Sequence, residues 1–123
     1  MDRLLDRQLD ALGRVIDLLH DELQALVEHD AVGLERTTAD KARALARADE
    51  FERRRRELAP TLTDMERFAE DPDIGRRWER LLDLTRQCRE RNEANGRLIR
   101  RRQARLEPAS GDRLSLVARR RHE

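Results

Sequence analysis

The fold class follows from one segment, residues 72–107, which reads PDIGRRWERLLDLTRQCRERNEANGRLIRRRQARLE. Asp71 supplies an N-cap and Pro72 a favourable first helical residue, so we expect a helix to begin here. Positions spaced alternately by four and three then continue to Pro108, which is typical of a helix that packs along one seam. They are Ile74, Trp78, Leu81, Thr85, Cys88, Asn92, Asn95, Ile99, Arg102 and Leu106. A helix of this length spans about 54 Å, so the sequence predicts an elongated protein.

Two more long helices are predicted upstream, over residues 2–29 and 31–59. The first carries a heptad seam, which consists of Leu5, Leu9, Leu12, Ile16, Leu19, Leu23 and Leu26. Asp30 interrupts that seam and is a good N-cap for the second helix. The second helix has a looser stripe of small and large apolar residues, which consists of Leu34, Ala42, Leu45, Ala48, Phe51 and Leu58. A short helix is expected over residues 61–70, because Pro60 can open a helix but not sit inside one.

The predicted fold is therefore all-α: an elongated antiparallel bundle of three long helices with coiled-coil-like seams, plus a short connecting helix. Residues 1–107 form a single helical bundle domain. We expect residues 108–123 to form a flexible C-terminal tail, because the segment opens with Pro-Ala-Ser-Gly, a sequence that favours a turn or loop.

Composition restricts the function. Charged residues make up 43% of the chain and hydrophobic residues 37%, which is too little apolar material for a thick core but enough for narrow helical seams. Residues 1–50 are acidic, whereas residues 86–106 are strongly basic. Either opposite charges meet across the bundle, or the basic segment is a nucleic-acid footprint. The net charge of +1 and the few aromatic residues argue against nucleic acid.

The sequence offers little for catalysis. His20, His29 and His122 are scattered, and there is no metal-ligand cluster or glycine loop for phosphate. The Asp21-Glu22 pair falls on a polar helix face, where solvated carboxylates are expected. Cys88 lies on the seam and is expected to be a buried core residue. We therefore expect no enzyme and no cofactor.

The location predicted from the sequence is the cytoplasm. A single cysteine fits a reducing compartment, and the charged N-terminus does not look like a signal peptide. The apolar runs are too short for membrane insertion.

In the last long helix the seam carries polar residues, Asn92 and Asn95, at two successive positions just before Gly96. One interpretation is structural: the amides hydrogen-bond across the bundle and fix its register, while Gly96 allows close backbone approach. The other is functional: the bundle is weakened here so that a partner helix can dock, with Leu98 and Ile99 as apolar contacts. If both asparagines are merely buried and register-setting, replacing them with leucine should raise thermal stability. If they line a partner-binding groove, binding should fall while the fold survives.

The same region resembles a known family. The run Cys88–Ile99, CRERNEANGRLI, with Trp78 and Leu81 upstream, is similar to the C-x-x-x-N-x-x-N-G-x-L-I motif of the FlgN family of flagellar export chaperones. Four residues of the second helix fit the family's D-x-x-x-L and K-x-x-x-L patterns, namely Asp30, Leu34, Lys41 and Leu45. The resemblance covers about residues 4–106. The tail departs from it, because family members often end in an aromatic and glycine-containing segment.

The resemblance implies a cytoplasmic chaperone of the flagellar type III export system. Such a protein binds the C-terminal helical segments of hook–filament junction (hook-associated) proteins, prevents their premature polymerisation and delivers them to the export apparatus. The candidate partner-binding residues are Asn92, Asn95, Gly96, Leu98, Ile99, Leu114, Leu116 and Val117. The alternative is a structural coiled-coil interaction module without chaperone activity, and a homodimer is compatible with either function.

Overall fold

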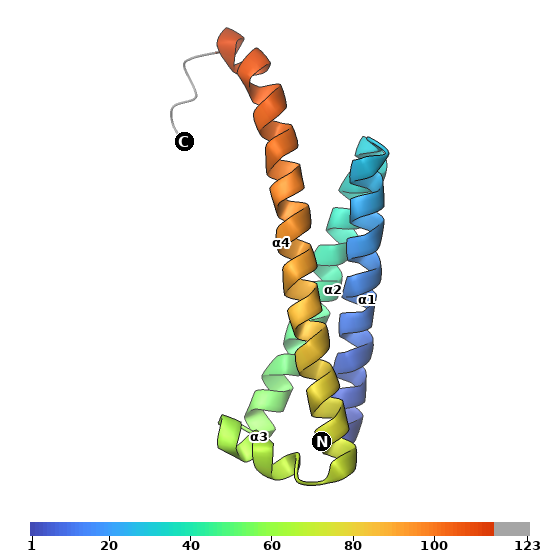
Figure 1. Cartoon of the computed structure of the whole chain (residues 1–123), viewed down its shortest axis with the longest axis vertical. Helices are drawn as coiled ribbons and strands as arrows, with labels where there is room; N and C mark the ends of the chain where they lie inside the picture. Colours follow the sequence, from blue (N-terminus) through green and yellow to red (C-terminus); the bar gives the residue numbers. More distant parts are fainter. Residues whose placement is uncertain (115–123) are drawn as a thin grey trace.

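The computed structural model describes the backbone of residues 1–114 and the side chains of residues 1–105. Every regular element in that part is a helix: α1 (Asp2–Val27), α2 (Ala31–Leu58), α3 (Leu62–Phe68) and α4 (Pro72–Leu114). Helices α1 and α2 form an antiparallel hairpin, α3 crosses the end of the molecule near the N-terminus, and α4 runs back along the hairpin (Figure 1). The predicted all-α fold is confirmed.

The turn between α1 and α2 consists of the C-terminal cap of α1 followed directly by the N-cap of α2. His29 adopts a φ of 56°, in the left-handed region, which ends α1. The His29 N–H donates to the Leu26 carbonyl (3.3 Å) and the Asp30 N–H to the Ala25 carbonyl (2.9 Å), which is the bonding pattern of a Schellman motif. The Asp30 side chain then accepts from the Gly33 N–H (2.9 Å), as the predicted N-cap requires. The turn is short because Asp30 belongs to both helix ends.

Helix α1 is central, because it packs against both α2 and α4. Its buried face is accordingly wider than the predicted seam. Leu5, Leu12, Leu19 and Leu26 of that seam are buried. A second set of buried residues lies beside it at heptad spacing: Gln8, Ala11, Val15, Leu18, Glu22 and Ala25. One helix thus carries two overlapping seams, one for each neighbour.

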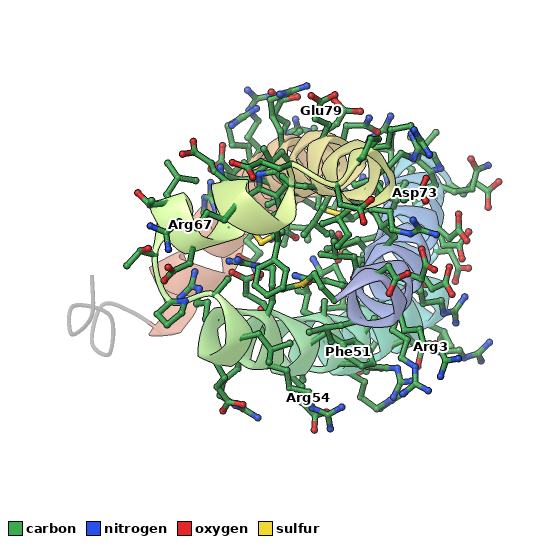
Figure 2. All side chains as sticks on the ribbon, turned by 90° about the horizontal axis from the view of Figure 1, so that it is seen from below. Arg3, Phe51, Arg54, Arg67, Asp73 and Glu79 are labelled. Carbon is green, nitrogen blue, oxygen red and sulfur yellow. The ribbon has the colours of Figure 1, made fainter. Side chains whose placement is uncertain are left out.

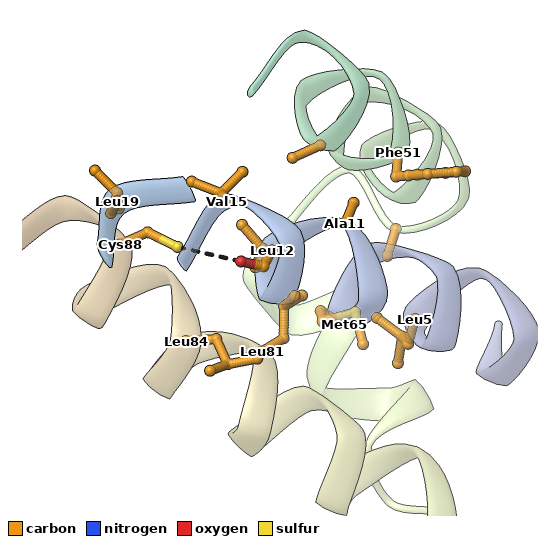
Figure 3. Packing of buried hydrophobic residues seen from close by; sticks show 12 residues of the cluster. Leu5, Ala11, Leu12, Val15, Leu19, Phe51, Met65, Leu81, Leu84 and Cys88 are labelled. Atoms are coloured by element: carbon orange, nitrogen blue, oxygen red, sulfur yellow. Dashed lines mark hydrogen bonds between the residues drawn. The ribbon is translucent and has the colours of Figure 1, made fainter. Parts of the chain in front are cut away.

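The apolar core lies where α1 meets α2, α3 and α4. Leu12, Val15 and Leu19 of α1 pack near Leu81 and Leu84 of α4 (Figure 3). Cys88 is buried as expected, and its thiol donates to the Leu12 carbonyl oxygen (3.7 Å). Burial raises the pKa of this thiol. A buried thiol with a raised pKa is a packing residue rather than a reactive group.

The N-terminal end of the bundle is tied by a polar link across three helices. Gln8 donates to Glu52 of α2 (2.7 Å), and Arg55 donates to the same carboxylate (2.8 Å) while its guanidinium stacks on Trp78 of α4 (4.9 Å). Burial would raise the pKa of Glu52, but the hydrogen bonds from Arg55 and Gln8 lower it to about 2. Many other charged side chains point outward from the bundle, Arg67 and Glu79 among them (Figure 2).

Several packing predictions were wrong. Leu23, Ala42 and Leu58 were assigned to seams, but all three are exposed. Leu23 is exposed because the second seam extends the buried face of α1 on the side away from that position. Leu58 lies at the last turn of α2, where the chain turns toward α3 and covers Ala59 instead.

The predicted end of the last helix was also wrong, because α4 continues beyond Glu107 to Leu114. Pro108 lacks one backbone donor, but its fixed φ is close to the helical value, so a helix can pass through it with the loss of one hydrogen bond. Figure 1 shows the consequence: the last turns of α4 extend past the α1–α2 turn. Residues 115–123 lie outside the described part, and the domain limits at 107 and 108 stay a prediction.

Candidate partner-binding site

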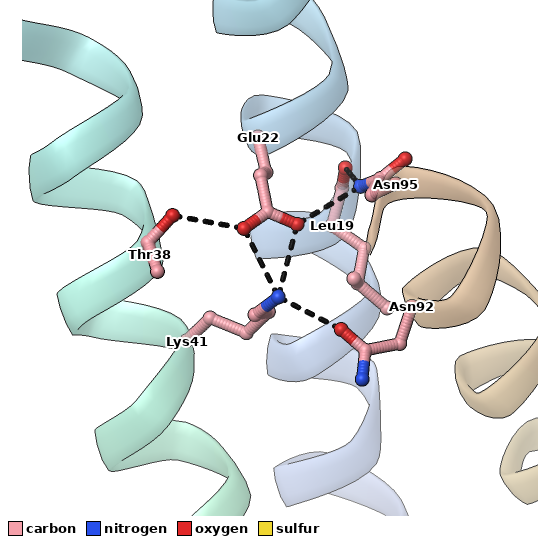
Figure 4. Close-up of polar contacts among 6 residues, drawn as sticks. All are labelled: Leu19, Glu22, Thr38, Lys41, Asn92 and Asn95. Carbon is pink, nitrogen blue, oxygen red and sulfur yellow. Dashed lines mark hydrogen bonds and ion pairs between the residues drawn. The ribbon is translucent and has the colours of Figure 1, made fainter. Parts of the chain in front are cut away.

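A fully buried carboxylate lies at the centre of the region that the sequence singled out. Glu22 of α1 has no exposed surface, although we expected it on a solvated face. Its carboxylate accepts hydrogen bonds from Thr38 (2.9 Å) and Lys41 (3.0 Å) of α2. It also accepts one from Asn95 of α4 (3.1 Å). Three helices therefore meet on one side chain (Figure 4).

The two asparagines play different parts in this arrangement. Asn95 is buried and donates both to Glu22 and to the Leu19 carbonyl oxygen (2.9 Å). Asn92 is exposed, contrary to its assignment to the seam, and accepts from the Lys41 ammonium group (2.7 Å). One part of the structural interpretation is confirmed: both amides hydrogen-bond across the bundle. We call Glu22, Thr38, Lys41, Asn92 and Asn95 the Glu22 cluster.

The Glu22 cluster provides the buried Glu22 carboxylate with an opposite charge and with hydrogen-bond donors. The Lys41 side chain is 13% exposed and the Glu22 side chain 0%, so the ion pair is largely desolvated. Such a pair is stable only if hydrogen bonds serve the remaining lone pairs, and Thr38 and Asn95 provide them. Because Asn95 belongs to α4 whereas Thr38 and Lys41 belong to α2, a shift of α4 along the hairpin would leave Glu22 without one of its donors.

Gly96 does not have the predicted role. A Cβ atom at this position would meet only the Arg100 side chain of the same helix, at 3.3 Å, and nothing else described within 4 Å. The glycine therefore does not mark a close approach between helices.

The remaining candidates lie along the C-terminal part of α4. Leu98 is 37% exposed and Ile99 is half-buried. Leu114 is the last residue of α4, but its side chain lies outside the described part, and so do Leu116 and Val117. The structure therefore brings the asparagines together with the hairpin, while the tail residues stay untested.

A shallow groove lies where α4 leaves the hairpin. Its lining comes from the end of α1 and from α4, and consists of Leu26, Val27, Leu98, Arg101, Arg102 and Arg105. Val27 is 65% exposed. Arg102 donates to the Leu26 carbonyl oxygen (2.6 Å), which places a cation at the negative C-terminal end of α1. This contact joins α4 to the end of the hairpin at the edge of the groove.

Sequence reasoning missed Val27, Glu22 and the lining arginines. The arginines had a signal, the excess of positive charge over residues 86–106. Glu22 had one as well, because it lies fourteen residues, two heptads, after Gln8 in the second seam of α1. Val27 had none, since it belongs to neither seam.

Other kinds of site find no support in the described residues. Within residues 1–114, no helix combines the length and hydropathy needed to cross a lipid bilayer. In the same part of the chain, no group of three or more His, Cys, Asp or Glu side chains could hold a metal ion.

Comparison with known proteins gives one match. A family model described as FlgN protein matches residues 1–109. The chain belongs to the FlgN family. No curated protein and no solved structure matches it. FlgN proteins are flagellar export chaperones, not a family of enzymes, and they bind flagellar hook-associated proteins.

The FlgN-like motifs now have a structural meaning. Asn92 and Asn95 of the last helix and Lys41 of the second are three members of the Glu22 cluster. Residues that the two motifs contribute separately therefore meet in one hydrogen-bonded unit. The FlgN-like pattern marks how α4 is fastened to the hairpin, next to the exposed groove.

Proposed function

We propose that this chain is a cytoplasmic chaperone that binds the C-terminal helical segments of hook-associated proteins, keeps them unpolymerised and delivers them to the flagellar type III export apparatus. The proposal rests on family membership and on one observation: α4 runs beyond the α1–α2 turn and leaves an apolar surface uncovered at Val27 and Leu98. A cargo segment that is disordered when free can add an amphipathic helix to such a surface.

The binding needs no catalysis. Holding a segment is an equilibrium, and ordering it costs free energy, so a dissociation constant of about 1 μM or somewhat tighter is expected, equivalent to about −8 kcal/mol. That strength is enough to occupy the cargo while still allowing release at the export apparatus.

The structural coiled-coil module remains the alternative. The buried face of α1 is already covered by α2 and α4, which favours the chaperone over assembly through that helix. Sedimentation separates the two: a stable higher oligomer that ignores cargo would support the module. Whether the free chain forms a homodimer stays a prediction.

Calorimetry with the C-terminal segment of a hook-associated protein from the same organism tests the proposal. We expect binding, and a gain of helical circular dichroism in the segment. Leu98→Asp should weaken binding at least about tenfold, because it places a charge in the apolar part of the contact. Leu82→Asp is the matched control, since Leu82 is a 49% exposed leucine of the same helix outside the groove. Absence of binding to the unmodified chain at about 50 μM would contradict the proposal.

A further inference from the structure

The groove is bordered by a row of positive charge. Arg97, Arg101 and Arg105 follow one another at every fourth position of α4, and all three are exposed. Residues four apart lie on the same helix face, so the three side chains start about 6 Å from each other along the helix axis. We call these three residues the basic ridge.

The basic ridge lacks the neutralisation found elsewhere on this helix. Residues 94–105 contain five arginines and neither Asp nor Glu. Nearer the start of α4, Arg77 pairs with Asp6 (2.7 Å) and Arg86 pairs with Asp83. Among the described residues, no carboxylate pairs with the ridge. Like charges at every fourth position destabilise a helix, so carboxylates from outside would stabilise this part of α4.

Apolar side chains lie directly beside the ridge. Leu98 and Val27 line the same groove as Arg101 and Arg105, and Arg97 lies one turn before Arg101 on the same face of α4. Arg102 is already engaged with the end of α1 and fixes the wall of the groove. The surface therefore combines a narrow apolar strip with a parallel row of arginines, none of which pairs with a carboxylate of residues 1–105.

We propose that the occupant of this groove is an acidic amphipathic helix. Its apolar residues at i, i+3 or i+4, and i+7 cover Val27 and Leu98, while carboxylates at every fourth position pair with the basic ridge. The inference rests on the proposed function and adds to it the chemical class of segment that the chaperone selects. Each exposed pair contributes little, so the row gives register and selectivity more than raw affinity.

A nucleic acid fits the same surface less well. Phosphates would match the arginines but leave Val27 and Leu98 uncovered. The three aromatic residues of the chain, Phe51, Phe68 and Trp78, all lie outside the groove lining, so bases would find no stacking partner there.

The test uses two synthetic helix-forming peptides with identical leucines, one with glutamate and one with glutamine at every fourth position. Calorimetry with the full chain should show the glutamate peptide binding about tenfold tighter, with the difference shrinking as salt is raised. Glutamine at all three positions of the basic ridge should abolish the difference. A control with Arg36→Gln, Arg53→Gln and Arg89→Gln, three exposed arginines outside the groove, should retain it. Restoration of binding between an Arg101→Glu chain and a lysine-bearing peptide would support direct pairing.

Three results obtained without the hook-associated segment would each overturn the inference. The first is equal affinity for the two peptides. The second is a short DNA duplex that binds more tightly than the glutamate peptide at moderate salt. The third is self-association that the ridge variant abolishes, which would assign the groove to a second copy.

Failure of the proposed function can be distinguished from failure of the acidic-helix inference. If the hook-associated segment binds the unmodified chain and the ridge variant equally well, the acidic-helix inference is wrong and the chaperone function stands. If the glutamate peptide binds selectively but that segment does not bind at all, the reverse holds.

Discussion

Lys41→Met tests whether the Glu22 cluster holds the bundle together. Methionine keeps much of the length of the lysine stem but removes the cation that faces Glu22. The Glu22 side chain is fully buried and the Lys41 side chain is 13% exposed, so the variant leaves a desolvated carboxylate with only the Thr38 and Asn95 donors. Removing one partner of a buried pair costs about 3–5 kcal/mol, and we expect about 3 because Lys41 lies toward the surface. This corresponds to a loss of about 12 °C in Tm.

The double variant Glu22→Met with Lys41→Met tests whether the loss of stability comes from the uncompensated Glu22 charge. With both charges gone, no uncompensated ion is buried, Asn95 keeps its bond to the Leu19 carbonyl, and stability should return to within about 1 kcal/mol of the unmodified chain. Urea unfolding followed by circular dichroism measures all three free energies. Arg43→Met, which removes an exposed ion pair with Asp40, is the control and should cost less than about 0.5 kcal/mol. The reasoning is refuted if Lys41→Met costs under about 1 kcal/mol, or if the double variant is as unstable as the two single variants added together.

Three further predictions concern single positions. Asn95→Leu should lower the free energy of unfolding by about 2 kcal/mol, because it removes a donor from buried Glu22; an increase, as the sequence suggested, would mean that the donor is dispensable. Gly13→Ala should raise it by about 1 kcal/mol, since no described atom beyond the adjoining turns of α1 lies within 4 Å of the added methyl group; a lower Tm would show that the space is filled. The Glu52 pKa is lowered from 4.5 to about 2, so its contribution is present above pH 4.5 and lost as the pH falls toward 2. After allowance for solvent screening that contribution is about 1–2 kcal/mol, and Glu52→Gln should flatten the acid limb of stability against pH; an unchanged limb would contradict the assignment.

The helices could be predicted from the sequence because their signals are local. Asp30 and Asp71 are caps whose hydrogen bonds reach only two or three residues along the chain, to Gly33 and Asp73. The long heptad pattern of α4 likewise predicts a helix whatever it packs against. Its C-terminal end was wrong because proline weakens a helix without forbidding it, so Pro108 alone could not fix the boundary.

The candidate site was less predictable, because its contacts join residues far apart in sequence. Asn92 and Asn95 were recognised as unusual, but nothing local identifies Glu22 or Lys41 as their partners. Glu22 was predicted to be solvated, because two adjacent acidic residues on an isolated helix are expected to face water. Its spacing of two heptads from Gln8 places it in a second seam, but the packing of α1 between two neighbours is what buries that seam.

Register connects the buried cluster with the exposed groove. In the second seam of α1, Gln8 and Glu22 stand two heptads apart with Val15 between them, and each bonds a different part of α2. An apolar seam alone would tolerate a slip of α4 by one heptad, which is about 10 Å along the axis. Such a slip would take Asn95 away from Glu22 and Leu98 away from Val27 at the same time. The polar cluster therefore determines how far α4 extends beyond the hairpin, and with it where the partner-binding surface is placed.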